Sequence, residues 1–240
     1  MCIGILTSPP NQRYMAKRIL KIFLYLFLSS TIYAVCCKVI MPPTTLTQLS
    51  SWLGPNGLTR DYVSGDEICP NLKLAAIASE DQLFPDHHGF DWDALEKSLA
   101  SKHKKRVRGG AASTISQQTA KNVFLWQGEG FTKYLRKIPE FYFTKVIEIV
   151  WGKKRILNVY LNVIETGPGL FGVEAAAQHY FHKPAKDLTR REAALIIACL
   201  PNPKKFQPDS GERYVQWHAN WILNQMSHIK NDPDIVELIH

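Results

Sequence analysis

Acidic residues are missing from the first quarter of this chain: in a sequence of 240 residues, no Asp or Glu occurs before Asp61. The same stretch carries six basic residues, namely Arg13, Lys17, Arg18, Lys21, Lys38 and Arg60. These cations supply most of the net charge of +8, so the rest of the chain is close to neutral. Positive charge confined to one end is typical of a chain that contacts a membrane, and it argues against a nucleic-acid partner.

A cysteine framework is also lacking. Of the five cysteines, Cys2, Cys36 and Cys37 belong to the amino-terminal segment, which leaves Cys69 and Cys199 further along the chain. One possible pair is not a framework of disulfides, and no Cys-x-x-Cys or Cys/His spacing typical of a zinc site occurs. We expect the last two cysteines to be buried, unpaired thiols.

A long apolar run is the main feature that the amino-terminal segment does have. Ile22 to Cys37 are 16 residues without a charge. As a helix they rise about 24 Å, short of a membrane core of about 30 Å. Apolar neighbours extend the run, and the bracketing Lys21 and Lys38 can reach the headgroups with their amines. We therefore predict a single transmembrane anchor at residues 19–41.

The cations before the anchor predict its orientation. The positive-inside rule places residues 1–18 in the cytoplasm and everything after the anchor outside the cytoplasmic membrane. A cleaved signal peptide is the alternative, but the best small-x-small window, Ala34-Val35-Cys36, is a poor cleavage site. A lipoprotein site at Cys36 is disfavoured by the bulky Tyr33 and Val35 before it.

Beyond the anchor, the patterns predict a mostly α chain. A double proline ends the span, residues 42–60 are interpreted as a tether, and residues 61–240 as one domain. Ser113 is expected to cap a helix that runs through Lys121, and Thr189-x-x-Glu192 is a capping box for a later helix. Apolar residues recur at helical spacing in residues 71–78, 135–149 and 156–164.

Three carboxylates and an imidazole fall within twelve positions, in the pattern Glu80-Asp81-x-x-Phe84-x-x-His87-x-Gly89-x-Asp91. Glu80 follows an apolar helical run, so its carboxylate is a candidate for partial desolvation against the core. Desolvation raises the pKa of a carboxyl group and makes a useful general base or acid. The alternative is a polar helix end followed by a solvated loop, and the pattern alone does not decide between the two.

A basic run, Lys102 to Arg108, leads into the small residues Gly109-Gly110-Ala111-Ala112-Ser113. Small residues before a helix let backbone amides approach an anion, but no Gly-Lys-Ser/Thr closes the stretch, so it is not a P-loop. A solvated surface is the favoured interpretation of the basic run. A polar stripe on one face of the next helix is harder to explain as surface because its flanks are apolar, and it consists of Thr114, Gln117, Gln118 and Lys121.

The segment Arg136-Lys137-Ile138-Pro139-Glu140 places two cations three and four residues before a carboxylate. On a helix this is either an ion-pair staple worth a few tenths of a kcal/mol, or a pair of fixed cations beside a carboxylate. The second arrangement suits a pyrophosphate leaving group, with or without a metal ion. Pro139 is best tolerated in a first helical turn, so the cations are expected where a helix begins.

Taken together, these stretches resemble the peptidoglycan glycosyltransferases, in particular the monofunctional biosynthetic transglycosylases, from about Leu72 to Pro203. Each segment is modest support alone, and their order makes the match specific. Two departures are a longer stretch at residues 109–113 and Thr166, where a large apolar residue is expected. Besides the Glu80 pattern, the matching segments are Ser113-Thr114-Ile115-Ser116-Gln117-Gln118-x-x-Lys121-Asn122, Arg136-Lys137-x-x-Glu140, Arg155-Ile156-Leu157-x-x-Tyr160-Leu161-Asn162, Gly172-Val173-Glu174-Ala175-Ala176-Ala177-x-x-Tyr180-Phe181 and Glu192-Ala193-Ala194-Leu195.

The resemblance implies a lysozyme-like α fold and an inverting transfer. The enzyme would polymerise β-1,4 glycan strands from the lipid-linked disaccharide-pentapeptide lipid II and release the polyprenyl pyrophosphate. Glu80 matches the general base that takes the proton of the acceptor 4-hydroxyl, and Glu140 matches a second essential carboxylate near the donor pyrophosphate. The candidate cofactor is a divalent cation, Mg²⁺ or Mn²⁺, at the pyrophosphate.

The implied partners are lipid II, the growing glycan strand, the membrane and other cell-wall synthesis proteins, with no nucleic acid among them. Cations are expected around the pyrophosphate, and neighbouring polar side chains are expected to line the donor cleft. The substrate-binding positions that the resemblance implies are Asp81, Phe84, His87, Ser113, Thr114, Gln117, Gln118, Lys121, Asn122, Arg136, Lys137 and Arg155.

Three other functions compete with this one. A bifunctional penicillin-binding relative would add a transpeptidase, but Ser101-x-x-Lys104 and Ser227-x-x-Lys230 are not followed by Lys-Thr-Gly, so we expect no transpeptidase activity. A lysozyme-like hydrolase or lytic transglycosylase needs neither an anchor nor a cationic pyrophosphate site. A membrane-tethered wall-binding scaffold would leave Glu80 and Glu140 without a purpose.

Overall fold

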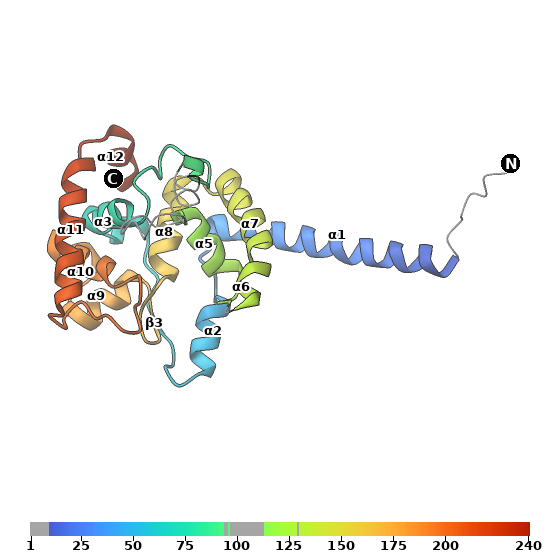
Figure 1. The fold of residues 1–240 in the computed structure, drawn as a ribbon, viewed down its shortest axis with the longest axis horizontal. Helices are drawn as coiled ribbons and strands as arrows, with labels where there is room; N and C mark the ends of the chain where they lie inside the picture. The colour runs from blue at the N-terminus through green and yellow to red at the C-terminus, as the bar shows by residue number, and fades with distance from the viewer. Residues whose placement is uncertain (1–9, 94–95, 97–112, 129) are drawn as a thin grey trace. The chain divides into compact units, whose positions relative to one another are not determined.

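The computed structural model describes residues 10–93, 96, 113–128 and 130–240. The predicted basic run at 102–108 and the small residues at 109–112 therefore lie outside the described residues. The chain divides into two units, Met1–Ile40 and Met41–His240, and each is described by itself (Figure 1).

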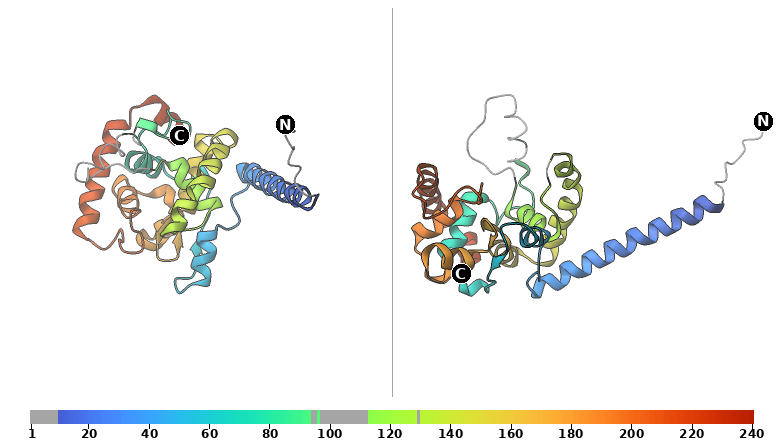
Figure 2. Two further views of the ribbon diagram at one scale, coloured as in Figure 1. Left: turned by 45° about the vertical axis from the view of Figure 1, so that its right-hand side comes forward. Right: turned by 90° about the horizontal axis from the view of Figure 1, so that it is seen from below.

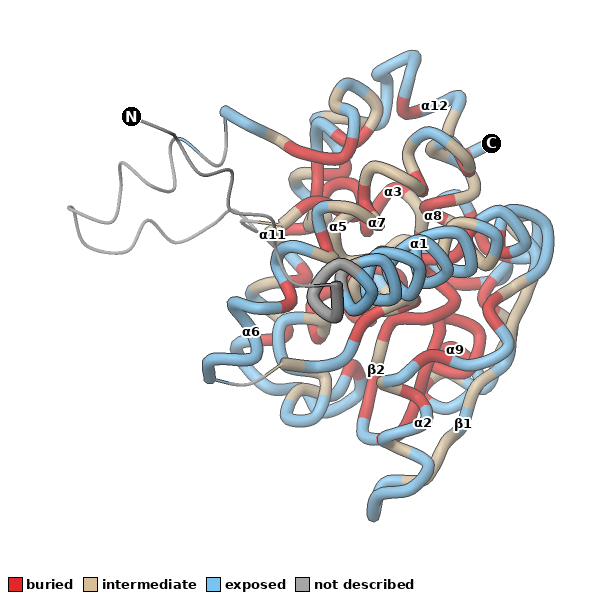
Figure 3. The backbone as a smooth tube through the Cα atoms, turned by 90° about the vertical axis from the view of Figure 1, so that its right-hand side faces the viewer, coloured by how far each residue is buried: buried red, intermediate tan, exposed pale blue. Residues whose placement is uncertain are grey.

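The first unit contains one long helix, α1 (Pro10–Val39). Its segment Lys17–Val39 has a mean hydropathy of 1.9 and is, in the part of the chain that the structure describes, the one helix long and apolar enough to cross a membrane. Most of this helix is exposed (Figure 3). Polar groups within it bond to the preceding turn, as Thr31 Oγ1 does to the Phe27 carbonyl at 2.8 Å, which suits an environment without water. The predicted amino-terminal apolar helix is confirmed.

The second unit is built from helices and one small sheet. Its elements, in chain order, are α2 (Leu46–Leu53), β1 (Thr59–Arg60), η1 (Gly65–Glu67), α3 (Pro70–Glu80), α5 (Ile115–Phe124), α6 (Phe131–Leu135), α7 (Lys137–Val150), α8 (Lys153–Val163), β2 (Glu165–Gly167), β3 (Leu170–Phe171), α9 (Val173–Phe181), η2 (Ala185–Asp187), α10 (Arg190–Ala198), α11 (Arg213–Ile229) and α12 (Pro233–Ile239).

The core of this unit lies between two groups of helices. Helix α3 packs against α10 and α11, while α5 packs against α7 and α8, and α11 and α7 lie on opposite sides of the unit (Figures 1 and 2). Small side chains let α3 and α10 approach closely, since Ala75 and Ala76 of the first helix and Ala194 of the second are fully buried. Cys69 and Cys199 are buried, free thiols, as expected. The mostly α class is confirmed.

The sheet has the order β1-β3-β2, with β1 parallel and β2 antiparallel to β3. Gly169, between β2 and β3, has a φ of +71°, and a Cβ there would lie 2.2 Å from the Asn56 carbonyl oxygen, so only glycine fits. Its own carbonyl accepts a hydrogen bond from Thr59 N–H at 2.8 Å. The segment 42–60, interpreted as a tether, thus contains a helix and a strand that pair with the domain.

Local signals predicted most helix positions. The capping box of Thr189 is present at the start of α10. The prediction that Ser113 caps α5 is wrong: the cap is Thr114, whose Oγ1 accepts from Gln117 N–H at 3.1 Å and donates to the Gly89 carbonyl at 2.8 Å. Ser and Thr are equally good helix caps by local sequence, so the sequence could not choose between Ser113 and Thr114. The hydrogen bond to Gly89, which is distant in the sequence, favours Thr114. The apolar repeat 135–149 falls on the last residue of α6 and on α7, and several of its side chains are exposed.

Candidate active site

Glu80 is the last residue of α3, after a run of buried side chains. Burial raises the pKa of its carboxyl group above the ordinary value of 4.5. The side-chain amide of Gln118, on α5, donates to Glu80 Oε2 at 2.9 Å, and Ser79 Oγ lies 3.4 Å from Oε1. These two bonds and the charge of His218 lower the pKa and so offset part of the effect of burial. The predicted desolvation is present, and the alternative of a solvated helix end does not hold.

Gln118 is itself held in a fixed orientation. Its Oε1 lies 3.4 Å from the hydroxyl of Tyr160, a fully buried side chain of α8. Burial raises the pKa of this hydroxyl well above 10.0, so it stays protonated and serves as a donor. The amide oxygen of Gln118 therefore faces Tyr160, and its nitrogen faces Glu80 and, at 3.5 Å, the carbonyl of Ser113.

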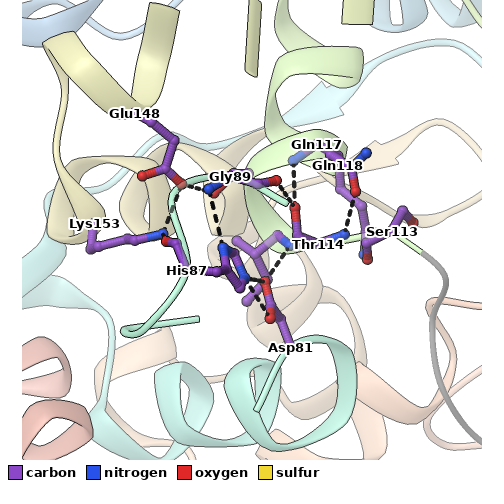
Figure 4. A network of polar contacts seen from close by, with 11 residues as sticks. Asp81, His87, Gly89, Ser113, Thr114, Gln117, Gln118, Glu148 and Lys153 are labelled. Carbon is purple, nitrogen blue, oxygen red and sulfur yellow. Dashed lines mark hydrogen bonds and ion pairs between the residues drawn. The ribbon is translucent and has the colours of Figure 1, made fainter. Parts of the chain in front are cut away.

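Asp81, the next residue, is buried and contacts only other parts of the domain (Figure 4). Its Oδ1 and Oδ2 lie 2.9 and 3.0 Å from His87 Nε2, and Oδ2 accepts from Ile115 N–H, at the start of α5, at 2.9 Å. Because Gly89 N–H donates to His87 Nδ1 at 3.1 Å, the imidazole carries its proton on Nε2. These bonds join the end of α3 to the start of α5 and thereby position Glu80.

The same network continues to α7 and α8 (Figure 4). Ser116 Oγ donates to Glu148, and Lys153 Nζ contacts Glu148 Oε1 at 2.7 Å and the His87 carbonyl at 2.6 Å. Burial lowers the pKa of the Lys153 amine, and the hydrogen bond to Glu148 acts against that shift. Sequence reasoning missed Glu148 and Lys153. The two residues are five positions apart on either side of a helix break, and this spacing matches no motif.

Several predicted substrate-binding residues are part of this scaffold. Thr114 and Gln117 form the capping box of α5, each side chain bonding to the backbone of the other. Phe84 is fully buried, and the Nζ of Lys153 lies 4.5 Å from the centre of its ring. The geometry supports a structural role for these side chains, as for Asp81, and their contact with substrate stays a prediction.

Glu140 lies in the first turn of α7 and is only 2% exposed. Lys137 Nζ donates to its Oε1 at 2.6 Å, and Arg136 Nε lies 3.4 Å from its Oε2. Among the described residues, Oε2 and Arg136 Nε have no hydrogen-bond partner, although Arg136 Nη1 donates to the Trp126 carbonyl at 2.9 Å. The burial excludes a solvated ion-pair staple, and it leaves two buried polar atoms that a ligand can satisfy.

Lys121, on α5, is affected by the charges of both candidate carboxylates, Glu80 and Glu140. Burial lowers the pKa of its amine, the neighbouring Arg136 and Lys137 lower it further, and the charges of Glu140 and Glu80 raise it. Helix α5, which carries Lys121, bonds to Glu80 at the end of α3 through Gln118 and packs against α7, the helix of Glu140, so α5 links the two carboxylates. Three cations against the single carboxylate of Glu140 make this part of the site attractive to a phosphate group.

A divalent cation does not fit the described part of this site. No group of three or more His, Cys, Asp or Glu side chains that could hold a metal ion occurs among the described residues. Glu140 is flanked by Lys137 and Arg136, and Lys137 already bonds its Oε1. Two cations beside one carboxylate repel Mg²⁺ or Mn²⁺.

A cavity of about 380 Å³ adjoins these groups, a volume within the range of small-ligand sites. Of the polar residues that line it, three were predicted and four were missed. Tyr160 belongs to a segment that matched the family, so its position in the motif was a usable signal, whereas the other three missed residues carry none. The polar side chains that line the cavity are Gln118, Lys121, Asn122, Gln127, Tyr160, Glu165 and Lys204.

Arg155 is not among the residues that line this cavity. It lines a different cavity of about 230 Å³, together with Asp66, Lys73 and Lys154. The structure therefore does not bring it together with Glu80, and its substrate-binding role stays a prediction.

Comparisons with known proteins cover the same residues. The transglycosylase family model matches residues 46–227. The chain is 53% identical over 191 residues to the biosynthetic peptidoglycan transglycosylase of Shigella boydii serotype 4 (strain Sb227), which covers 78% of this chain and 77% of that one. It has the same identity and coverage with proteins of that name from Escherichia coli (strain K12 / DH10B) and Escherichia coli O9:H4 (strain HS).

Proposed function

The chain belongs to the transglycosylase family and is a peptidoglycan transglycosylase, and from this premise we propose that it polymerises glycan strands from lipid II. In the proposed reaction the 4-hydroxyl of an acceptor sugar attacks the anomeric carbon of the lipid-linked donor. The glycosidic bond forms with inversion, and the bond to the polyprenyl pyrophosphate breaks.

Glu80 acts as the general base in this proposal. Burial raises the pKa of Glu80, and a carboxylate with a raised pKa is a stronger base than an exposed one. The amide nitrogen of Gln118 holds Oε2 at 2.9 Å, so Oε1 is the oxygen left to receive the acceptor proton, because its neighbour Ser79 Oγ is at 3.4 Å. The buried Tyr160 keeps that amide in place.

The cation group receives the leaving group. As the bond to the donor breaks, negative charge accumulates on the pyrophosphate, and the amines of Lys121 and Lys137 and the guanidinium of Arg136 stabilise it. Glu140 keeps two of these cations at fixed positions through contacts of 2.6 and 3.4 Å. Preorganised charges lower the barrier because they need no rearrangement during the reaction.

The observation that carries the proposal is the position of helix α5. It holds both Gln118, which donates to Glu80 at 2.9 Å, and the cation Lys121, and it packs against α7, the helix of Glu140. This arrangement supports one substrate that reaches both the candidate base and the candidate pyrophosphate site. A hydrolase of the same polymer has no anionic leaving group and makes no use of three cations beside a base.

The test is incubation of the purified full-length protein, in detergent micelles, with lipid II. We expect a glycan polymer and equimolar release of polyprenyl pyrophosphate. Shortening of pre-formed glycan strands without polymer formation would identify a hydrolase or lytic enzyme instead. Strand binding with neither product would identify a scaffold. Released D-alanine from the peptide would contradict the absence of transpeptidase activity.

We further propose that α1 is a single-pass anchor in the cytoplasmic membrane, with the domain on the periplasmic side. Its segment Lys17–Val39 is apolar enough to span, and four basic residues precede the uncharged run that begins at Ile22. Two reporters fused after His240 test the orientation: one active only outside the cytoplasm should be active, and one active only in the cytoplasm should be silent. The opposite result overturns the orientation.

A further inference from the structure

Glu165 is a carboxylate of the cavity that the proposed mechanism does not use. It is the first residue of β2, just after α8 ends, and pairing of β2 with Phe171 of β3 fixes its backbone. Its side chain is 13% exposed and lines the cavity together with Gln118 and Lys121. Gln118, which donates to Glu80, therefore lines the same cavity as Glu165.

The Oε1 atom of Glu165 is unsatisfied. It is buried and has no hydrogen-bond partner among the described residues. The Nζ of Lys204 lies 3.6 Å away, an ion-pair distance that is too long for a hydrogen bond, and the lysine side chain is 60% exposed. Such a pair stabilises the fold little, because water screens the exposed partner. Burial raises the pKa of Glu165, while Lys204 and the Gly169 backbone N–H act in the opposite direction.

Glu174 shows what a structural carboxylate of this domain looks like. It is 6% exposed, and both of its oxygens are used: Oε1 accepts from Gln178 Nε2 at 2.8 Å and Oε2 from Ala185 N–H at 2.7 Å. Glu165 is less fully buried, but its buried Oε1 has no partner among the described residues, and the residue lines a cavity. A buried acceptor without a donor costs stability, so its presence here points to a donor that comes from a ligand.

The chemistry of the cavity limits that donor. A carboxylate repels phosphate, so the pyrophosphate belongs at the end of the cavity where Lys121 lies, and Glu165 needs an O–H or N–H group. The wall around it also has the apolar side chains of Ile164, Leu200 and Pro203. Hydroxyl and amide donors on a ring with apolar faces are the features of an N-acetylated pyranose.

We propose that Glu165 is a saccharide-binding residue, whose Oε1 accepts a hydrogen bond from a hydroxyl or acetamido N–H of a sugar next to the reacting bond. Lys204 holds the carboxylate at the cavity wall in the absence of sugar. The inference rests on the proposed function, since it names the part of the substrate that binds to this side of the cavity.

Two substitutions test the role of the acceptor oxygen. Glu165→Leu keeps a comparable volume and removes the acceptor, whereas Glu165→Gln keeps one neutral acceptor oxygen. We expect the Leu variant to raise the KM for lipid II roughly ten- to hundredfold with little change in kcat, because a hydrogen bond to a buried charge is lost. The Gln variant should restore most of the affinity.

Thermal unfolding separates binding from a structural role. Removing an unsatisfied buried charge should leave Tm unchanged or raise it in both Glu165 variants. The matched control is Glu174→Gln, which loses a satisfied acceptor and should lower Tm while the KM stays within about twofold, since Glu174 only bonds to its own domain. A fall of Tm in both Glu165 variants with an unchanged KM would show that Glu165 is structural, and an unchanged KM of the Leu variant at unchanged Tm also overturns the proposal.

A soluble probe keeps this result distinct from failure of the proposed function. Binding of a β-1,4-linked tetramer of N-acetylglucosamine is measured by calorimetry, without any turnover. The wild type should bind it and Glu165→Leu should bind it at least about fivefold more weakly; equal binding by both, or binding by neither, contradicts the inference. An inactive wild type that binds the probe through Glu165 would contradict only the polymerase function.

The donor and acceptor sugars carry the same chemistry, and blocked substrate separates them. Lipid II that is capped at its 4-hydroxyl can act only as donor. A raised KM for the capped substrate, at saturating uncapped acceptor, assigns Glu165 to the donor sugar. A raised KM only for the uncapped substrate assigns it to the acceptor sugar.

Discussion

Glu80 and Asp81 are adjacent in the sequence, but their carboxylates belong to two different regions of the domain. Asp81 is part of the scaffold between α3 and α5, where both of its oxygens face His87 and one also accepts from the backbone of Ile115. Glu80 instead accepts its one short bond from Gln118, a residue that lines the cavity, and burial raises its pKa.

The difference between these regions lies in how many of their polar atoms are paired. In the scaffold, Asp81, His87 and Glu148 are each bonded within the domain, so they stabilise the fold and have little left for a substrate. On the cavity side, Glu140 and Glu165 each keep a buried oxygen without a partner among the described residues. Unpaired buried oxygens cost stability, and at an active site a bound substrate compensates for them.

Glu80→Gln should have the largest effect on activity and should not destabilise the domain. Loss of a general base lowers the rate by about 10² to 10⁴, while substrate binding changes little. The folded-state pKa of Glu80 is raised, so its ionised form weakens the fold at neutral pH, and the Gln variant should show an equal or higher Tm. Polymerisation assays and thermal unfolding check both, with the exposed Glu212→Gln as control. Near-wild-type polymerisation would remove the assignment of the base.

Glu140→Gln should lower turnover by roughly ten- to a hundredfold, because the cations at the pyrophosphate lose their fixed positions. Donor affinity should hold or rise, since net positive charge is left behind. The matched comparison is Glu148→Gln, which also breaks a buried contact to a lysine but lies in the scaffold. We expect both variants to lower Tm and only Glu140→Gln to lower kcat strongly. Equal activity of the two variants would show that Glu140 has a structural role like that of Glu148.

Asp81→Asn should lower Tm more than it lowers activity, which is the reverse of what we expect for Glu80→Gln. The amide nitrogen of Asn cannot accept from His87 Nε2–H and Ile115 N–H together, so a buried donor loses its partner. We expect Tm to fall by roughly 2 to 10 °C and activity to fall less than in Glu80→Gln. Asp86→Asn, at an exposed neighbouring position, is the control and should leave Tm unchanged. An unchanged Tm for Asp81→Asn would contradict the scaffold role.

The pH dependence of kcat/KM should reflect the opposite shifts of two cavity groups. The base Glu80 works only when ionised and its pKa is raised, so activity should rise with pH through a range above 4.5. Lys121 stabilises phosphate only when protonated and its pKa is lowered, so activity should fall again below 10.5. Lys121→Arg, which stays charged, should move the alkaline limb upward. A flat profile across both limbs would contradict these two roles.

Deletion of residues 1–41 should have the smallest effect on chemistry. The anchor raises the local concentration of substrate in the membrane and supplies no catalytic group. The truncated protein should no longer sediment with membranes, while its turnover in detergent micelles stays within a few-fold of the full chain. Circular dichroism must show it folded, and complete loss of micellar turnover by the folded domain would give the anchor a catalytic role.

Local patterns predicted those parts of the structure that depend on neighbouring residues. The apolar run predicted α1, the apolar repeat before Glu80 predicted α3, and the spacing of Thr189 and Glu192 predicted the capped start of α10. Periodicity and capping act over three or four residues, so one sequence is sufficient to recognise them.

The tertiary structure decided which of the polar residues are paired. Thr114 rather than Ser113 caps α5 because it also reaches Gly89, and Lys204 approaches Glu165 from a separate turn of the chain. Burial and pairing depend on residues far away in the sequence, and no local spacing contains that information. The sequence by itself determined the apolar helix and the main helices, and it identified Glu80 and Glu140 as candidate carboxylates. Their distribution between scaffold and cavity was decided only by the packing of α3, α5, α7 and α8, which sets what each oxygen touches.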